Sequence, residues 1–244
     1  MINPYQHHRA IERFPVWVEK DFVKMFPNFS DNLVSNDNIV FQWKDRFSNY
    51  PNKTLMLIGG GPSSSDTSWK EHSYDYLWSM NQFYKSKIFE NVKVDLAMIM
   101  SETNLDDECL IDKVNRDNTL LGFESHDKWI NCSLKKDEKY FCMHTKFYGK
   151  IGIGARMKIF AAQLGFDKVL FTGFDGPEEI FLGNHTFEPG KTTLPSVFLG
   201  QREELVSAHH KMQYDYLWEL IKKEYPKTTF INLGGGEKYH ERSK

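Results

Sequence analysis

The chain has few cysteines, no long apolar run and no run of signal-peptide character, and each shortage narrows the class of protein. Its three cysteines are an odd number without CxxC spacing, so the sequence indicates neither a disulfide framework nor a zinc ribbon. No segment reaches the roughly 18 apolar residues of a membrane span, and the N-terminus lacks the apolar core of a signal peptide. These shortages predict a protein without a transmembrane segment in a cytoplasmic, reducing setting.

The chain also lacks an excess of positive or negative charge. The 244 residues include 31 Lys and Arg against 33 Asp and Glu, which gives a net charge of -2. A general nucleic-acid binder needs a basic face, so nucleic acid is not an expected partner. Hydrophobic residues make up 40% of the chain, which is enough for one large core. The length predicts one large domain, or one domain with an appendage.

The most distinctive stretch is TLMLIGGGPSSS, Thr54–Ser65. The apolar run Leu55–Ile58 has the length of a buried parallel strand. Three glycines, Gly59–Gly61, follow it, and Pro62 stops the strand before Ser63 and its neighbours offer N-cap chemistry. A strand, a glycine turn and a helix start together direct backbone N–H groups at a phosphate or carboxylate. The spacing matches neither the GxGxxG fingerprint nor a P-loop, and a tight turn without a ligand is the alternative.

Strand and helix patterns alternate from Thr54 onward, which is typical of a mostly parallel sheet with helices on both faces. We therefore expect an α/β fold, a single Rossmann-like nucleotide-binding domain over residues 51–244, with an N-terminal helical appendage over residues 1–50. The expected strands are Thr54–Ile58, Tyr74–Met80, Val94–Met100, Thr119–Phe123, Tyr140–Met143, Lys168–Thr172 and Thr228–Asn232. The expected helices are Lys150–Leu164, with Gly165 as its C′ residue, and Glu203–Tyr225.

Polar and glycine-rich segments follow four of these strands. They are Gly59–Ser63, Asn81, Gly173–Asp175 and Gly234–Gly236. Because ligands of open α/β sheets bind at the carboxyl ends of the strands, we expect these segments to converge on one site.

Three of the segments carry a family resemblance. The sequences IGGGPS, YLWSMNQFY and VLFTGFD resemble the bacterial lipooligosaccharide sialyltransferases, which have a Gly-Asn-Gly-Pro-Ser turn and a Cys-Asn-Gln-Phe-Tyr segment at similar spacing. The likeness runs in short islands from Thr54 to Leu233, and Asn81–Tyr84 is its most specific island. A weaker likeness links the chain to the hydroxymethylpterin diphosphokinase-like and motility-associated glycosyltransferase families.

The resemblance implies a metal-independent glycosyltransferase of surface glycan synthesis. Its partners would be a nucleotide-linked donor, such as a CMP-sugar, and a glycan acceptor, with no further cofactor; a homo-oligomer stays open. The implied nucleotide- and substrate-binding residues are Gly59, Gly60, Gly61, Pro62, Ser63, Asn81, Gln82, Gly152, Gly154, Gly173 and Asp175, and the implied general base is His209.

The sequence also departs from the family pattern. Gly60 replaces the Asn of the family's turn, Ile153 stands where the family has a phosphate-binding Ser, and Met100 stands near a nucleotide-binding Asn. His185 and Phe187 lie in the segment where the family has two tyrosines that steady the leaving phosphate. These differences weigh more against CMP-sialic acid in particular than against a nucleotide-linked donor.

Metal-free glycosyl transfer needs a base for the acceptor and a group that stabilises the departing phosphate. His209 and His210 would lie in the first turn of the expected helix, where the helix dipole keeps an imidazole neutral. The apolar stripe of that helix places His210 among buried positions and His209 at the edge, which favours His209 as the base. The alternative is that both histidines serve packing or lie on the surface.

Two further polar residues are candidates. His185 could act on the leaving phosphate as a cation or hydrogen-bond donor, or be an exposed loop residue. Asp175 could hold a ribose hydroxyl or cap the turn after its strand. For Gly59→Val, we expect lost nucleotide binding in a protein that still folds.

Two other functions remain open at this stage. A pterin-type diphosphokinase would need Mg²⁺ and a carboxylate cluster, for which Asp175, Glu178 and Glu179 are the nearby residues. A non-catalytic nucleotide-binding module that kept the fold is favoured by the departures at Met100 and Ile153.

Overall fold

The computed structural model describes a defined part of the chain. The described residues are 33–34, 47, 49–99, 103–124, 140–143, 153–175, 183–191, 196–199, 202–205, 222–223 and 225–234. All structural statements below concern these residues.

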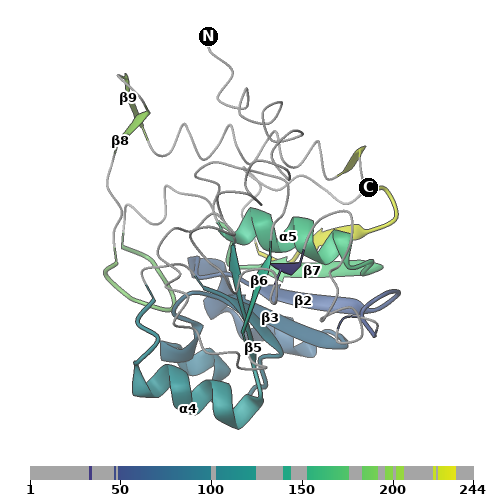
Figure 1. Cartoon of the computed structure of the whole chain (residues 1–244), viewed down its shortest axis with the longest axis horizontal. Helices are drawn as coiled ribbons and strands as arrows, with labels where there is room; N and C mark the ends of the chain where they lie inside the picture. Colours follow the sequence, from purple (N-terminus) through teal and green to yellow (C-terminus); the bar gives the residue numbers. More distant parts are fainter. Residues whose placement is uncertain are drawn as a thin grey trace.

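An eight-stranded sheet forms the centre of the molecule (Figure 1). Its order is β1-β6-β5-β4-β3-β2-β7-β10, and every neighbouring pair is parallel. The strands are β1 (Leu33–Val34), β2 (Thr54–Ile58), β3 (Tyr76–Met80), β4 (Leu96–Met98), β5 (Leu120–Glu124), β6 (Tyr140–Met143), β7 (Lys168–Thr172) and β10 (Thr229–Asn232). This sheet confirms the predicted α/β, Rossmann-like fold class, and all seven predicted strands are found with boundaries that differ by at most two residues.

The strand order reverses next to β2. From β2 the chain adds β3, β4, β5 and β6 on one side, and then returns to place β7 and β10 on the other side. Right-handed crossovers in opposite directions put their helices on opposite faces of a sheet. Accordingly, α4 (Glu108–Asp117) and α5 (Ile153–Gln163) lie on opposite sides of the sheet (Figure 1). The carboxyl ends of β2 and β7 therefore form a topological switch point, where open α/β sheets bind ligands.

Short 3₁₀ turns, rather than α-helices, follow β2 and β3. They are η2 (Pro62–Ser65), η3 (Thr67–Glu71), η4 (Phe83–Lys85) and η5 (Lys87–Phe89). The predicted helix over Lys150–Leu164 is confirmed as α5. Gly165 ends it with φ +81°, and Phe166 N–H donates to Ala161 C=O as in a Schellman motif.

One helix prediction was wrong at its start. The predicted helix Glu203–Tyr225 begins inside β9 (Arg202–Leu205), which pairs antiparallel with β8 (Ser196–Leu199) in a second, two-stranded sheet. Only Gly200 and Gln201 separate the two strands, and a two-residue Gly-X connection is typical of a hairpin. Here strand pairing outweighs the helix propensity of the Glu-Glu-Leu sequence.

The core beside β2 and β3 is rich in aromatic rings. Leu55, Met56, Leu57 and Ile58 of β2 are each 0% exposed, as expected for a parallel strand that is covered on both faces. Near α5, the ring of Trp78 stacks on Phe160 at 5.7 Å between centroids and meets Phe166 edge-on at 5.3 Å. The abundant aromatics thus form a thick core that fixes β3 and β2, the strands that lead into the candidate site.

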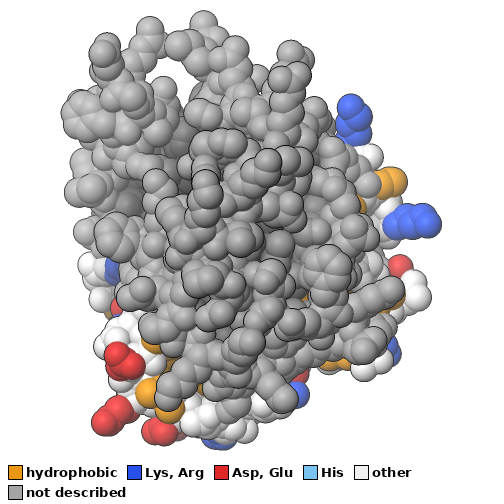
Figure 2. Space-filling model, in the orientation of Figure 1, with side chains coloured by type: hydrophobic (Ala, Val, Ile, Leu, Met, Phe, Trp, Pro, Cys, Tyr) orange, Lys and Arg blue, Asp and Glu red, His pale blue; other side chains and the backbone are white. Residues whose placement is uncertain are grey.

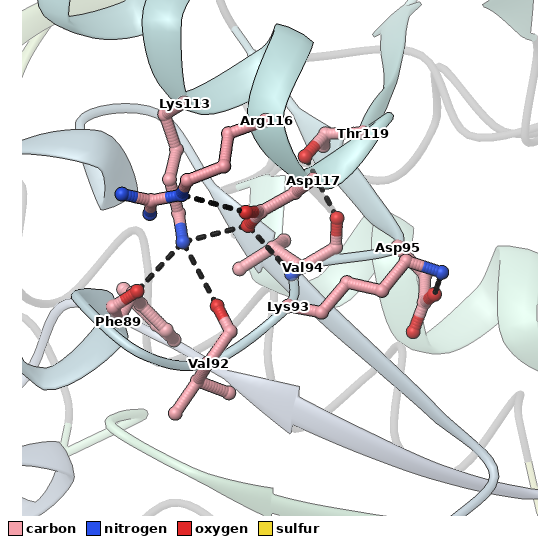
Figure 3. Close-up of polar contacts among 9 residues, drawn as sticks. All are labelled: Phe89, Val92, Lys93, Val94, Asp95, Lys113, Arg116, Asp117 and Thr119. Carbon is pink, nitrogen blue, oxygen red and sulfur yellow. Dashed lines mark hydrogen bonds and ion pairs between the residues drawn. The ribbon is translucent and has the colours of Figure 1, made fainter.

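The amino ends of the strands are closed by a repeated Asp arrangement. The carboxylates of Asp75, Asp95 and Asp117 accept hydrogen bonds from the backbone N–H groups of Thr54, Leu77 and Val94 at 2.9, 2.9 and 3.0 Å. Each Asp also pairs with a lysine, which is Lys53, Lys93 or Lys113. Figure 3 shows the most buried of these pairs, Lys113 and Asp117.

Charges of both signs lie at the surface. Figure 2 shows acidic side chains over the region of α4, where Glu108 and Asp112 are exposed, and basic side chains at the opposite margin of the same face. Among the described residues, no helix is long and apolar enough to cross a bilayer.

Candidate functional site

The glycine turn after β2 packs directly against the turn after β7. A Cβ atom on Gly59 would overlap the carbonyl of Gly173, and one on Gly173, whose φ is +78°, would overlap the carbonyl of Gly59. The absent side chains therefore allow two backbone segments to touch. The expectation that Gly59→Val leaves folding intact was wrong, because the added side chain would meet backbone rather than open space.

Most amide groups of this turn already have partners. Gly59 N–H and Gly61 N–H donate to the carbonyls of Thr172 and Gly173 at 2.8 and 2.9 Å. Ser63 N–H donates to the Asp175 carboxylate at 3.0 Å. Asp175 thus caps the turn after β2 and not, as predicted, the turn after its own strand β7. Its charge occupies a position that a phosphate on Ser63 N–H would need.

His185 covers the remaining glycine of the turn. A Cβ on Gly60 would overlap the imidazole ring at Cε1 and Nε2. The neighbouring Thr186 fixes this arrangement, since its N–H donates to Gly60 C=O at 2.8 Å and its hydroxyl to Gly61 C=O at 2.9 Å. Three predicted parts of the site therefore lie together: the glycine turn, Asp175 and His185.

The hydrogen bonding of His185 defines its tautomer. Nδ1 accepts a hydrogen bond from Glu188 N–H at 3.1 Å, so the neutral ring carries its proton on Nε2. Burial lowers the pKa of His185 below its usual value, and Lys191 adds to this effect while Glu188 opposes it. The ring is consequently a neutral N–H donor at the face of Gly60, which corresponds to the donor role and not the cationic one.

Two more of the predicted glycines, Gly154 in α5 and Gly234 after β10, contact different residues. A Cβ on Gly154 would overlap the Phe174 ring, so Gly154 allows that ring to pack on α5. A Cβ on Gly234 would overlap Ser63 Oγ, which itself accepts from Gly173 N–H at 2.9 Å. The loops after β2, β7 and β10 therefore meet as predicted. Gly152, His209, His210, Gly235 and Gly236 lie outside the described residues, and their roles stay predictions.

The segment after β3 borders a pocket of about 510 Å³. Its walls come from Gln82–Lys85, from Thr103–Asp107 ahead of α4, and from Glu188–Lys191; we call it the Gln82 pocket. Asn81, with φ +46° and its N–H bonded to Met98 C=O at 2.8 Å, turns the chain into this wall. The pocket lies at the carboxyl edge of the sheet, next to the His185 segment.

Charged groups of the pocket are paired with one another. Glu188 binds Lys85 at 2.8 Å and Lys191 at 2.7 Å. Burial alone would raise the pKa of Glu188, but these lysines outweigh it and hold the pKa below its usual value. Asp107 accepts hydrogen bonds from the Tyr84 hydroxyl at 3.1 Å and from Cys109 N–H at 3.0 Å. Burial is the main cause that raises the pKa of Tyr84, and the hydrogen bond to Asp107 adds to it.

Thr103, Asp107 and Glu188 line the pocket but were not predicted as site residues. Tyr84 and Lys85 could have been predicted, because Tyr84 ends the Asn81–Tyr84 island and Lys85 directly follows it. The only signal for Glu188 was its place three residues after His185. Among the described residues, no group of three or more His, Cys, Asp and Glu side chains could hold a metal ion.

Comparisons with known proteins agree with this architecture. No protein-family model and no curated protein sequence matches the chain. Among solved structures, it is similar to the monofunctional alpha-2,3-sialyltransferase Cst-I from Campylobacter jejuni, with a TM-score of 0.51, 12% identity, and 75% of this chain and 76% of that one covered. It is also similar to the sialyltransferase CST-II in complex with a trisaccharide acceptor and CMP, with a TM-score of 0.50, 14% identity, and coverage of 78% and 89%. At this identity the likeness shows a shared, sialyltransferase-like α/β fold.

Proposed function

We propose that the chain is a glycosyltransferase that binds a nucleotide-linked sugar and transfers the sugar to a glycan acceptor. The observation that carries the proposal is the meeting of the glycine turn, the Asn81–Tyr84 segment and His185 at the carboxyl edge of the sheet. The fold is similar to that of CST-II, whose structure contains CMP and a trisaccharide acceptor. Surface glycan synthesis and metal independence are parts of the same proposal.

In the proposed mechanism, His185 stabilises the leaving phosphate. A neutral Nε2–H donor that is fixed before reaction stabilises charge as it develops on the departing oxygen. Asp175 acts on the turn instead, because its carboxylate is bound to Ser63 N–H. A phosphate beside that carboxylate would be repelled, so the donor phosphate belongs on the Gly60 and His185 side. His209 is the proposed base for the acceptor hydroxyl.

A second function, a non-catalytic sugar- or nucleotide-binding module, is favoured by one observation. The amides of Gly59, Gly61 and Ser63 donate within the protein, which leaves less of the turn for a phosphate than a ligand-binding glycine loop offers. This module would bind a ligand without transferring a sugar.

The test is a thermal-shift panel of CMP, UDP, GDP and ATP, each with and without Mg²⁺, followed by a transfer assay with sugar nucleotides of the stabilising base. A ligand that binds the folded state raises the melting temperature. A metal-independent shift plus nucleotide release supports the transferase. A shift without turnover supports the module, and a shift that requires Mg²⁺ with ATP supports the diphosphokinase alternative.

A further inference from the structure

The loop that contains His185, residues 183–190, is closed on itself; we call it the His185 loop. Gly190 N–H donates to Gly183 C=O at 2.9 Å, and φ is positive at both glycines. The Phe187 ring between them is 2% exposed, and it meets Phe89 and His185 edge-on at 5.5 and 5.7 Å between centroids. Loops with joined ends that pack on their own side chains are compact units. The contacts of this unit with the glycine turn therefore decide where the imidazole lies.

Thr186 makes those contacts. Its N–H donates to Gly60 C=O at 2.8 Å, and its hydroxyl donates to Gly61 C=O at 2.9 Å. The next residue towards the N-terminus is His185, whose ring occupies the space in which a Gly60 Cβ would lie. Two successive carbonyls of the turn thus bind one residue of the loop, directly beside the imidazole.

The hydroxyl of Thr186 is not needed to satisfy the turn. Gly61 C=O also accepts from Ser64 N–H at 3.1 Å and from Ser64 Oγ at 2.8 Å. A carbonyl has two lone pairs, so it stays paired when the Thr186 hydroxyl is removed. The loop, by contrast, loses a link beside His185. This bond therefore affects the position of the loop more than the stability of the turn.

A second side-chain link of the loop is weaker. The Glu188 carboxylate binds Lys85 at 2.8 Å, but the lysine side chain is 42% exposed. Exposed ion pairs of this kind contribute little to stability. Thr186, which is half-buried and adjacent to His185, consequently has the larger influence on the ring.

The glycine turn has little hydrogen-bonding capacity left for a phosphate, because the N–H groups of Gly59, Gly61 and Ser63 donate within the protein. What lies at the face of Gly60 is the imidazole of His185, with its proton on Nε2. A donor stabilises developing charge only when it is fixed in place, and an error of about 1 Å can cost up to about 10²-fold in rate. The seating of the ring is therefore part of its chemistry.

We infer that Thr186 is a positioning residue, which seats His185 on the glycine turn so that the turn presents an imidazole N–H to the leaving phosphate. This inference rests on the proposed function and adds a residue to its site. Thr186 acts through His185 and does not itself contact the substrate.

The titration of the His185 ring reports its seating without any turnover. Burial and Lys191 lower the pKa of the seated ring, and Glu188 opposes them. Residues 59–63 of the turn contain no titratable side chain, and the nearest carboxylate bound to the turn is that of Asp175. A ring that leaves its seat becomes more exposed, so its pKa should rise toward about 6.5. NMR titration of the full chain measures this pKa, and the His185→Ala spectrum assigns the signal.

Thr186→Val keeps the branched shape and removes the hydroxyl. We expect the pKa of His185 to rise while the melting temperature stays nearly the same; Thr186→Ala repeats the test if Val does not fit. Thr186→Ser should restore the wild-type titration. Ser64→Ala is the matched control, because it removes a hydroxyl from the same Gly61 carbonyl without touching the loop, and it should leave the titration of His185 unaltered. A wild-type titration in both Thr186→Val and Thr186→Ala overturns the inference.

Transfer kinetics show whether Thr186 acts through His185. Thr186→Val should lower kcat about fivefold, as for one lost hydrogen bond, with KM nearly unchanged, and Thr186→Ser should recover the rate. In the His185→Ala background the same change should have no further effect. An equal additional loss in that background overturns the inference, because Thr186 would then act independently of His185.

The two proposals fail in different ways. If the wild-type chain turns over no sugar nucleotide, the transferase proposal fails, while the titration still decides whether Thr186 seats His185. If the chain transfers sugar but Thr186→Val changes neither the titration of His185 nor kcat, the proposed function stands and the positioning inference fails.

Discussion

The two edges of the central sheet treat polar groups in opposite ways. At the amino edge, Asp117 satisfies Val94 N–H, and Lys113 donates to the carbonyls of Phe89 and Val92 at 2.6 and 2.8 Å as well as binding Asp117 (Figure 3). At the carboxyl edge, Gln82 Oε1 and Thr103 Oγ1 are buried without a partner. A fully satisfied network helps to specify a unique fold, whereas each buried polar group without a partner costs free energy. The difference separates a structural edge from a candidate binding edge.

Two buried lysines differ in the groups that surround them. Lys113 lies among oxygen atoms, whereas Lys158 Nζ lies over the rings of Phe171 and Phe174 at 3.7 and 4.4 Å from their centroids. Burial lowers the pKa of both lysines, and in Lys113 the hydrogen bond that the ammonium donates to Asp117 opposes the shift. Sequence position alone does not distinguish them, since both are cations on helices that cover the sheet. The predictions below use this contrast between the edges.

The largest effect should come from Gly59→Val at the switch point. The side chain would collide with the backbone of Gly173, so we expect a loss of more than about 4 kcal/mol in the free energy of unfolding, or no folded protein. Urea unfolding measures this loss. The matched control is Gly190→Ala, where φ is +83° but nothing lies within 4 Å of the added Cβ; it should cost about 1 kcal/mol. A stable Gly59→Val protein would contradict the packing of these two turns.

The next largest loss of stability should come from Lys113→Met at the amino edge. Removing the ammonium group leaves the buried Asp117 carboxylate with fewer partners, so stability should fall by about 3 kcal/mol. Lys93→Met is the control one strand away, because its Asp95 pair is similar but the lysine side chain is 65% exposed; it should cost less than about 1 kcal/mol. Chemical denaturation compares the two, and sugar and nucleotide binding should be unchanged in both. Equal losses would show that burial does not set the difference between these pairs.

A smaller effect on stability, but a direct one on function, is expected for His185→Ala at the carboxyl edge. Loss of a fixed N–H donor should lower transfer by a factor of about 10² with nucleotide affinity nearly unchanged. His185→Gln, which keeps a donor, should recover part of the rate. Because burial lowers the pKa of His185 below its usual value, the neutral ring predominates at pH 7 and above, and this residue should cause no loss of activity between pH 7 and about pH 8. Full activity of His185→Ala would remove this residue from the mechanism.

The sequence predicted the regular part of the fold well, for identifiable reasons. The run Leu55–Ile58 is apolar without alternation, which only a strand covered on both faces requires, and Gly165 ends α5 by a local rule. The start of the predicted helix at Glu203 was wrong because residues 203–205 have helix propensity but pair with β8. Local sequence does not contain that pairing.

The candidate site was only partly predictable. Its edge of the sheet followed from topology, and Asp175 and His185 were named as candidates because of their residue types. The partners of the glycines were not predictable, since contacts such as those of Gly59 with Gly173 join residues more than 100 positions apart. The Gln82 pocket could not be predicted for the same reason, because Thr103 and Glu188 belong to different loops and neither residue lies in a distinctive motif.

The smallest effect should come from Lys158→Met, which tests the second buried lysine. Lys158 is 1% exposed, and its pKa is lowered well below the usual value by burial, although the faces of Phe171 and Phe174 favour the charged ammonium. Since the unfolded chain binds more protons than the folded one below about pH 10.5, the native state loses stability as the pH falls from that value toward the lower folded pKa. Met has a similar length and no charge, so it should raise stability by about 1–2 kcal/mol at pH 7. The gain should shrink as the pH approaches 10. Thermal unfolding of both proteins between pH 6 and 10 measures it, and a destabilised Lys158→Met would place this lysine with Lys113, as a cation that the fold requires.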